Sequence, residues 1–314
     1  MLTDDNQYKY TAFGIDIQST IPLSGFLSHV PNSPDRSETD LTVKLGFLPQ
    51  RSEDLGFGAN KVYSDNAEGV QIYRLQGGFF LSYQGVGSLV VETNEITVSP
   101  NPAADQDSVK WLVTNLGLRL ALVARGAVVF HASAVVIDDT LVSFTGPSGR
   151  GKSTVAAACY ASGHVHHSDD LVPVFPQSSG EASCAPPGPP RLRVNADVVP
   201  SLELSPPQSK QTDRKVRIDT SARHSTRYQA IDVLYLIEDA ESIAINEVPA
   251  HDAVLEILRQ SYALYRDSDT DSARAHFERC SQLARSMSVR TLSRPRSLQR
   301  LQEVVSSIEE DVLE

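Results

Sequence analysis

One eight-residue segment, GPSGRGKS from Gly146 to Ser153, restricts the fold of this chain more than any other feature. It matches the pattern G-x-x-x-x-G-K-[ST] at every fixed position. The segment TLVSFTG directly before it predicts a buried strand, and a helix is predicted to begin near Lys152. A strand, a glycine-rich loop and a helix in this order predict an α/β domain that binds phosphate at the start of the helix.

The residues of this loop have separate physical tasks. Its glycines let backbone N–H groups approach phosphate oxygens closely, and the helix directs its positive end at the same oxygens. Lys152, expected to be exposed, would place its charge on the β and γ phosphates, while Ser153 would offer a hydroxyl to Mg²⁺. The residues predicted to bind nucleotide are Gly146, Ser148, Gly149, Arg150, Gly151, Lys152, Ser153 and Thr154. The alternatives are a turn that only caps a helix and a dinucleotide site, but G-x-G-x-x-G is not present in that order.

Two adjacent aspartates, Asp169 and Asp170, follow the predicted helix at the end of the extended segment HVHHSDDLVPVF. Neighbouring side chains of an extended segment point to opposite sides, so the two carboxylates can do different jobs. One can bind Mg²⁺, and the other can orient or deprotonate an attacking hydroxyl. The alternative is a solvated turn, which is the interpretation we give to Asp138 and Asp139.

Several basic and imidazole side chains have two interpretations each. His131 lies in an apolar strand pattern, which is more typical of a core histidine than of a catalytic one. Three further histidines could suggest a metal site, but without Cys or Glu at ligand spacing they indicate a polar strand end; they are His164, His166 and His167. Three cations could add charge to a triphosphate or be solvated loop charges; they are Arg193, Lys215 and Arg217.

The rest of the chain divides into a β-rich module at residues 1–105, a helix at 106–126 and the loop-bearing domain at 127–314. Alternating apolar residues predict strands at 41–47, GVQIYRLQ, FFLSYQ, SLVVET and EITVSP. The helix is expected to be capped by Asp107 or Ser108 and to join the two halves. AVVFHASAVVI is predicted to be a single strand. Two segments rich in Pro, Gly, Ser and other polar residues predict exposed loops: residues 176–190 and SPPQSKQTDRK.

Charge and composition restrict the partners. The chain has 314 residues, a net charge of -11 and an isoelectric point near 5.2, which disfavours nucleic acid and anionic membranes as partners. Three widely spaced cysteines without a C-x-x-C pattern favour reduced thiols. The N-terminal MLTDDNQYKY lacks the features of a signal peptide, and no apolar run is long enough to span a membrane. We therefore expect a cytoplasmic protein.

The segment FHASAVVIDDTLVSFTGPSGRGKSTVAAACYASGHVHHSDDLVPV, residues 130–174, resembles the HPr kinase-like proteins. Members of this family have a phosphate loop, a preceding strand with a histidine, and an Asp-Asp pair after the first helix. The chain looks most like the stand-alone members found near ribosomally made peptide pathways, including lasso-peptide kinases. Weaker likenesses are YTAFGIDIQSTIPLSGF, PPRLRV and SRPRSLQRLQEVV.

The resemblance implies an α/β P-loop kinase domain of the HPr kinase and phosphoenolpyruvate carboxykinase-like type, preceded by the β-rich module. It implies that Asp169 handles the substrate hydroxyl, that Asp170 helps to bind Mg²⁺ beside Ser153, and that His131 lies next to them. Asp169, His131 and Lys152 are thus the predicted catalytic residues. The N-terminal module does not resemble that of bacterial HPr kinase, and its second glycine-rich signature is absent from this sequence, so the resemblance does not extend to HPr as substrate or to phosphorylase activity.

These observations predict a Mg-nucleotide-dependent kinase that phosphorylates a Ser or Thr hydroxyl of a peptide or protein, with the β-rich module helping to hold that substrate. Two alternatives stay open: a kinase for a small-molecule hydroxyl such as free serine, and a nucleotide-sensing regulator without transfer activity. The donor could be ATP, ADP or GTP. A homo-oligomer is compatible with the sequence, which does not set the oligomeric state.

Overall fold

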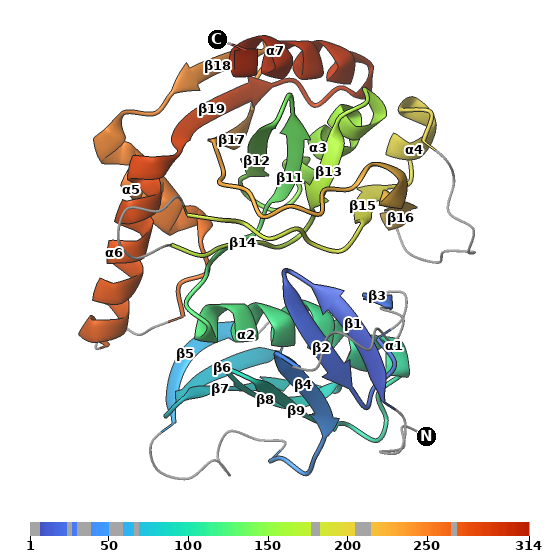
Figure 1. The fold of residues 1–314 in the computed structure, drawn as a ribbon, viewed down its shortest axis with the longest axis vertical. Helices are drawn as coiled ribbons and strands as arrows, with labels where there is room; N and C mark the ends of the chain where they lie inside the picture. Colours follow the sequence, from blue (N-terminus) through green and yellow to red (C-terminus); the bar gives the residue numbers. More distant parts are fainter. Residues whose placement is uncertain are drawn as a thin grey trace. The chain divides into compact units, whose positions relative to one another are not determined.

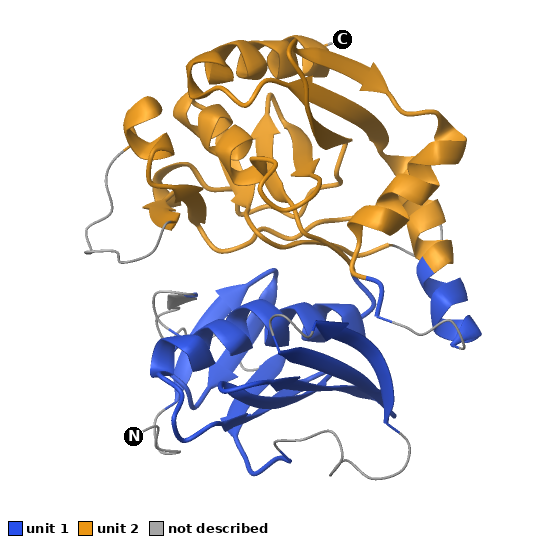
Figure 2. Cartoon of the chain, turned by 180° about the vertical axis from the view of Figure 1, so that it is seen from behind, with its two compact units in different colours: residues 1–127, 263–276 blue, residues 128–262, 277–314 orange. Residues whose placement is uncertain are grey.

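The computed structural model describes residues 7–23, 27–29, 39–49, 59–65, 69–176, 183–204, 215–264 and 269–313. By their contacts the residues group into two compact units (Figure 2). Unit 1 comprises residues 1–127 with 263–276, and unit 2 comprises 128–262 with 277–314. The helix expected to join two halves is counted in unit 1, because it packs against the sheet of that unit.

Unit 1 is rich in strands (Figure 1). They form one sheet in the order β3-β1-β2-β4-β9-β8-β7-β6-β5. Their bounds are β1 (Tyr8–Ala12), β2 (Ile15–Ser19), β3 (Ser28–His29), β4 (Leu41–Leu45), β5 (Asn60–Asp65), β6 (Val70–Leu75), β7 (Gly78–Tyr83), β8 (Gly87–Glu92) and β9 (Glu95–Pro100). The five strands predicted from alternation are present as β4 and β6 to β9. In β4 the apolar Leu41 and Val43 are buried and Thr42 between them is not, as a sheet with one covered face requires.

The long helix of unit 1 has three parts: α1 (Gln106–Trp111), the π-helical turn η2 (Leu112–Gly117) and α2 (Leu118–Ala124). It lies on β7, β8 and β9. The predicted cap was wrong, since Asp105 caps the helix: its carboxylate accepts hydrogen bonds from the backbone N–H of Ser108 at 2.8 Å and from its hydroxyl at 2.5 Å. An aspartate three residues before Ser108 satisfies a first-turn donor that Asp107 and Ser108, inside the helix, cannot reach.

Unit 2 is a mixed α/β unit built on a sheet in the order β13-β11-β12-β17-β19-β18. Its strands are β10 (Val128–Phe130), β11 (Ser133–Ile137), β12 (Thr140–Thr145), β13 (Val165–Ser168), β14 (Val172–Val174), β15 (Arg191–Asn195), β16 (Lys215–Asp219), β17 (Val233–Asp239), β18 (Ala244–Glu247) and β19 (Ser288–Arg294). Its helices are α3 (Lys152–Ala161), α4 (Val198–Ser201), η3 (Ser221–Arg223), α5 (Ala250–Gln260), η4 (Leu298–Arg300) and α7 (Leu301–Leu313). The first residues of a further helix, α6 (Thr270–Ser286), are counted with unit 1.

Four strands of this sheet end at the same edge. β12, β17 and β19 are parallel, and β11 is antiparallel to both β12 and β13. β13 therefore runs in the same direction as β12. The segments that follow these strands meet at one edge of the sheet, the edge where α/β proteins place their ligands.

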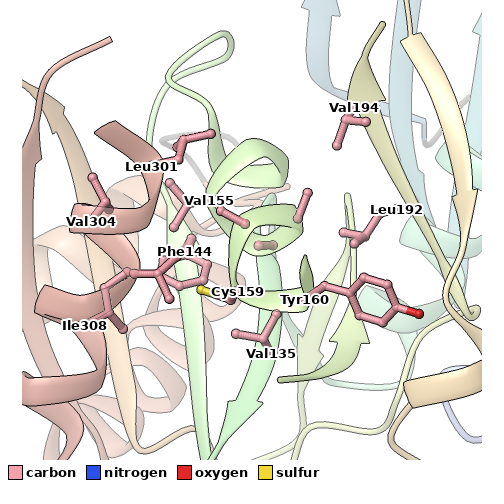
Figure 3. Close-up of a cluster of buried hydrophobic side chains, with 14 of the residues drawn as sticks. Val135, Phe144, Val155, Cys159, Tyr160, Leu192, Val194, Leu301, Val304 and Ile308 are labelled. Atoms are coloured by element: carbon pink, nitrogen blue, oxygen red, sulfur yellow. The ribbon is translucent and has the colours of Figure 1, made fainter. Parts of the chain in front are cut away.

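Two hydrophobic clusters cover the two faces of this sheet. In β17, Val233, Tyr235 and Ile237 belong to one cluster, whereas Leu234 and Leu236 belong to the other. Helices α3 and α7 cover the first face, with the apolar side of β15 beside them (Figure 3). Helices α5 and α6 cover the second face. Of the helices that the structure describes, none is both long enough and apolar enough to cross a membrane.

Two predictions about this unit were wrong. The segment expected to be one strand, residues 127–137, is divided at His131 into β10, which pairs with β14, and β11, which pairs with β12 and β13. Residues 183–190, the described end of a loop expected to be exposed, are largely buried. Two backbone hydrogen bonds hold this segment: the N–H of Ala185 donates to the carbonyl oxygen of Gln229 at 2.7 Å, and the N–H of Gly188 donates to the carbonyl oxygen of His167 at 2.9 Å. The side chain of Ala185 belongs to the core. The remainder of that loop, residues 177–182, and residues 205–214 of the second predicted loop lie outside the described residues.

Candidate active site

The glycine-rich loop has the backbone that its sequence predicts. It joins β12 to α3, and φ is +139° at Gly146, +80° at Gly149 and +85° at Gly151. A Cβ atom added at Gly149 would meet no heavy atom within 4 Å, whereas one at Gly151 would lie 2.1 Å from Nη2 of Arg294. The left-handed conformations and this close contact explain why the positions are glycine. Open space beside Gly149 leaves room for a phosphate group.

The start of α3 presents positive charge to this loop. No side chain caps the helix at Gly151, so its first N–H groups stay directed at the loop. Lys152 was expected to be exposed but is only 6% exposed, because its Nζ turns back and donates to the carbonyl oxygens of Gly146 at 2.8 Å and Pro147 at 3.3 Å. Burial lowers the pKa of Lys152, the charge of Lys215 lowers it further, and the two aspartates oppose the shift.

The structure places Asp169 close to the loop residue Ser153. Asp169 follows β13, and its Oδ1 accepts a hydrogen bond from the hydroxyl of Ser133 at 2.5 Å. Oγ of Ser133 lies 3.4 Å from Oγ of Ser153. The second carboxylate oxygen of Asp169 accepts from the backbone N–H of Arg193 at 2.8 Å. Two strands and the loop thus fix one carboxylate beside the hydroxyl predicted to bind Mg²⁺.

Asp170 has a different environment. Its backbone is in the left-handed region, with φ +67°, which non-glycine residues seldom adopt. Its Oδ2 lies 3.6 Å from Nη1 of Arg193. Burial, followed by the charge of Asp170, raises the pKa of Asp169 to about 6, while hydrogen bonds from Ser133, Arg193 and Ser153 oppose the shift. The two neighbouring carboxylates therefore differ in their bonding partners: Asp169 accepts hydrogen bonds from Ser133 and from the backbone of Arg193, whereas Asp170 lies beside the guanidinium of Arg193.

A cationic hairpin face lies next to these carboxylates. In the antiparallel pair β15–β16, Arg193 is opposite Arg217, Arg191 opposite Asp219 and Asn195 opposite Lys215. The alternate residues Leu192, Val194, Val216 and Ile218 belong to the core. Alternation therefore places the three predicted cations on one face, together with Arg191, which the sequence analysis missed. Burial and the charge of Arg217 lower the pKa of Arg191 to about 10, and Asp170 opposes this. The period-two pattern of RLRVN was the signal for this residue.

A second group of charges holds the other side of the loop. Nη2 of Arg294 donates to the carbonyl oxygen of Arg150 at 2.7 Å. Nη2 of Arg296 lies 3.4 Å from the carbonyl oxygen of Gly149. Asp239, at the end of β17, forms ion pairs with Arg150 and, at 2.9 Å, with Nε of Arg296. The sequence did not predict Asp239, Arg294 or Arg296 as part of the site, because only the fold brings the ends of β17 and β19 to the loop.

The histidines differ in their surroundings. His131 lies between β10 and β11, partly exposed, and its carbonyl oxygen accepts from the hydroxyl of Thr145 at 3.4 Å. His166 and His167 lie in β13, as the interpretation of a polar strand end requires, and both side chains are fully buried. Nδ1 of His166 lies 2.8 Å from Oγ1 of Thr220 and 3.2 Å from Nδ1 of His224. Across the described ranges, no three His, Cys, Asp or Glu side chains gather as a metal site by themselves.

The residues at the loop fit a Mg-nucleotide. Mg²⁺ prefers oxygen ligands and is usually bound by one or two protein groups together with substrate phosphates and water. Ser153 and Asp170 supply a hydroxyl and a carboxylate of that kind. The loop offers an uncapped helix end, open space beside Gly149 and a buried ammonium group. A site of this composition does not need a cluster of three protein ligands.

No protein-family model matches this chain, and no curated sequence matches it at a significant level. Among solved structures, the HPr(Ser) kinase/phosphatase from Coxiella burnetii is similar over 59% of this chain and 92% of its own, with 15% sequence identity and a TM-score of 0.32. A TM-score of this size does not establish a common fold. The function must therefore be inferred from the residues of the site.

Proposed function

We propose that this chain is a kinase of the HPr kinase-like type, which transfers a phosphoryl group from a Mg-nucleotide to a Ser or Thr hydroxyl of a peptide or protein. The observation that supports this most is the series Asp169, Ser133 and Ser153, with separations of 2.5 Å and 3.4 Å. It places a carboxylate able to accept a proton beside a glycine-rich loop suited to phosphate. Phosphoryl transfer requires both in one site.

The chain's own residues have defined roles in this reaction. The loop amides and Lys152 would hold the phosphate chain, while Ser153 and Asp170 would hold Mg²⁺, which when bound shields the negative charge of the phosphate oxygens. Asp169 would orient the acceptor hydroxyl and take its proton as the new oxygen–phosphorus bond forms and the bond to the leaving nucleotide breaks. A carboxylate whose pKa is raised to about 6 is a better proton acceptor than an ordinary aspartate and is still ionised near neutral pH.

The cationic hairpin face would stabilise the transferred group. Arg193 donates its backbone N–H to Asp169 and lies with its guanidinium at 3.6 Å from Asp170, so the hairpin is fixed next to the reacting atoms. Arg191 and Arg217 share that face. Cations positioned in advance around a phosphoryl group stabilise the charge that spreads over its oxygens during transfer. The buried apolar side of the same hairpin packs in the core and holds these charged residues in place.

The test is a transfer assay with labelled nucleotide. ATP, ADP and GTP would each be supplied with a peptide library in which one Ser or Thr is flanked by randomised residues, and in parallel with free L-serine. We expect label on the peptides from the wild-type chain and none from Lys152→Met, which removes the loop charge but keeps the length of the side chain. Label on serine alone would favour a small-molecule kinase. Nucleotide binding without label on either acceptor would favour a regulator and contradict the proposed function.

A further inference from the structure

A cavity of about 620 Å³ lies on the side of the loop away from the aspartates. All of its walls belong to unit 2: Gly146, Pro147 and Arg150 from the loop, the end of β17, a residue of β19, and one side of α5. Its volume is within the range of about 300–1,000 Å³ that is typical of small-molecule sites. None of the residues to which we assigned a role in phosphoryl transfer, apart from the loop itself, lines it.

The order of the strands places the loop between this cavity and the reacting carboxylates. Asp169 follows β13, the loop follows β12, and the cavity is lined by residues of β17 and β19, with the strands in the order β13-β11-β12-β17-β19. These strands end at the same edge of the sheet. A phosphate chain held by the loop, with its transferred end toward Asp169, therefore has its other end directed toward the cavity.

We propose that this cavity holds the nucleoside half of the phosphate donor. The inference rests on the proposed function, since it uses the direction that the aspartates give to the phosphate chain. It assigns a ligand-binding role to α5 and to the end of β17, which the sequence analysis did not connect with nucleotide.

The chemistry of the walls suits a nucleoside. Leu236 is a buried side chain of β17 on the face that α5 covers, and the half-buried Val248 packs against the same cluster, so the two give a base an apolar surface. Asp252 and Glu256 on α5 supply carboxylate oxygens, which accept hydrogen bonds from sugar hydroxyls and from the amino groups of a base. Apolar walls with a few placed polar groups are what orient a small ligand.

Arg150 belongs to both the loop and the cavity. Its side chain lines the cavity and is held there by the ion pair with Asp239, while its carbonyl oxygen accepts from Arg294. The contact fixes a planar cation next to the start of the phosphate loop. A guanidinium in that position can stack on a base or pair with the first phosphate. Arg150 thus joins the part of the site that would hold phosphate to the part that would hold the nucleoside.

The experiment separates the two halves of the donor by calorimetry, with Mg-ATP and Mg-tripolyphosphate as the two probes. Asp252→Trp would fill the cavity from α5, where the aspartate side chain is 50% exposed, so that the fold tolerates the change. His251→Trp is the matched control, because His251 is the neighbouring residue, is 82% exposed and does not line the cavity. Both variants remove the contact between these two side chains.

We expect Asp252→Trp to weaken Mg-ATP binding at least about tenfold while tripolyphosphate binding stays within about twofold, and His251→Trp to change neither. Equal ATP affinity of Asp252→Trp and wild type would overturn the cavity assignment and leave the phosphate loop intact. If the wild type bound neither Mg-ATP nor Mg-tripolyphosphate, the proposed function itself would be overturned. If the wild type transferred no phosphoryl group but Asp252→Trp still weakened the binding of Mg-ATP alone, the result would support the nucleoside site and contradict the proposed kinase activity.

A second measurement needs no substitution. Hydrogen exchange of the wild-type chain would be recorded with Mg-ATP and with Mg-tripolyphosphate. We expect both probes to slow exchange at the start of α3, but only Mg-ATP to slow it in α5 and at Glu238 and Asp239. Identical protection of α5 by the two probes would show that the nucleoside lies elsewhere.

Discussion

The two sides of the glycine-rich loop use charge differently. On the carboxylate side, Asp169 and Asp170 face Arg193 and the hairpin cations without bonding to the loop backbone. On the arginine side, Arg294 and Arg296 donate to loop carbonyl oxygens. Charged groups that lie beside the loop without bonding to it can act on a ligand, whereas charged groups bonded to loop carbonyl oxygens hold the loop in shape. Substitutions on the first side should therefore act on transfer and on the bound metal, and those on the second should act on the shape of the loop.

The largest effect is expected for Asp169→Asn. The variant keeps the size of the side chain and can still pair with Ser133 and the N–H of Arg193, but it cannot accept the hydroxyl proton, so single-turnover transfer should fall by about 10²–10⁴-fold. Mg-nucleotide affinity should stay near that of the wild type. Asp170→Asn is the comparison, because it should weaken metal-dependent binding and recover partly at higher Mg²⁺. The opposite pattern would reverse the roles of the two aspartates.

The pH dependence of stability sharpens the same prediction. The pKa of Asp169 is raised from 3.8 to about 6 by burial, so the folded state binds this proton more tightly than the unfolded state. Its contribution to the free energy of unfolding is complete below about pH 4 and is lost as the pH rises through 6. Without added metal, the free energy of unfolding of Asp169→Asn should therefore rise relative to that of the wild type between pH 4 and 7. The expected gain is on the order of 1–3 kcal/mol, measured by urea denaturation. A constant difference across this range would contradict the raised pKa.

The contrast between the two sides also explains what the sequence could predict. The loop, α3 and the aspartate pair lie in one continuous segment, so their order follows from local patterns of glycine, charge and apolar residues. The strands of unit 1 were found for the same reason. That this unit helps to hold the substrate stays a prediction, because no motif within it points to a particular ligand.

The residues that were missed come from distant parts of the chain. Ser133 reaches Asp169, and Arg294 reaches Arg150, only because the sheet brings their strands together. A single sequence carries no signal for such pairings. The burial of Lys152 was misjudged for a related reason: the side chain is charged, and only the fold shows that its ammonium group lies against the carbonyl oxygens of Gly146 and Pro147.

The next largest effect is expected for Arg294→Met on the arginine side. Arg294 is 4% exposed, and its loss would leave the carbonyl oxygen of Arg150 without this donor. We expect the free energy of unfolding to fall by about 1–3 kcal/mol and Mg-ATP affinity to fall about tenfold, because the loop loses its shape. Urea denaturation and calorimetry measure the two effects. Arg300→Met, which removes a surface arginine bonded to Glu303, should change neither.

The smallest effect is expected for Arg296→Ala, which tests whether the arginine side acts as one network. The side chain of Arg296 is 59% exposed, and its partner Asp239 keeps the ion pair with Arg150 when Arg296 is removed. Exposed pairs contribute little, since water and salt screen them. We expect an unchanged urea midpoint and a loss of Mg-ATP affinity of no more than about threefold, which should disappear at high salt. If Arg296→Ala were as harmful as Arg294→Met, Asp239 and the two arginines would hold the loop as a unit, and burial would not be what distinguishes them.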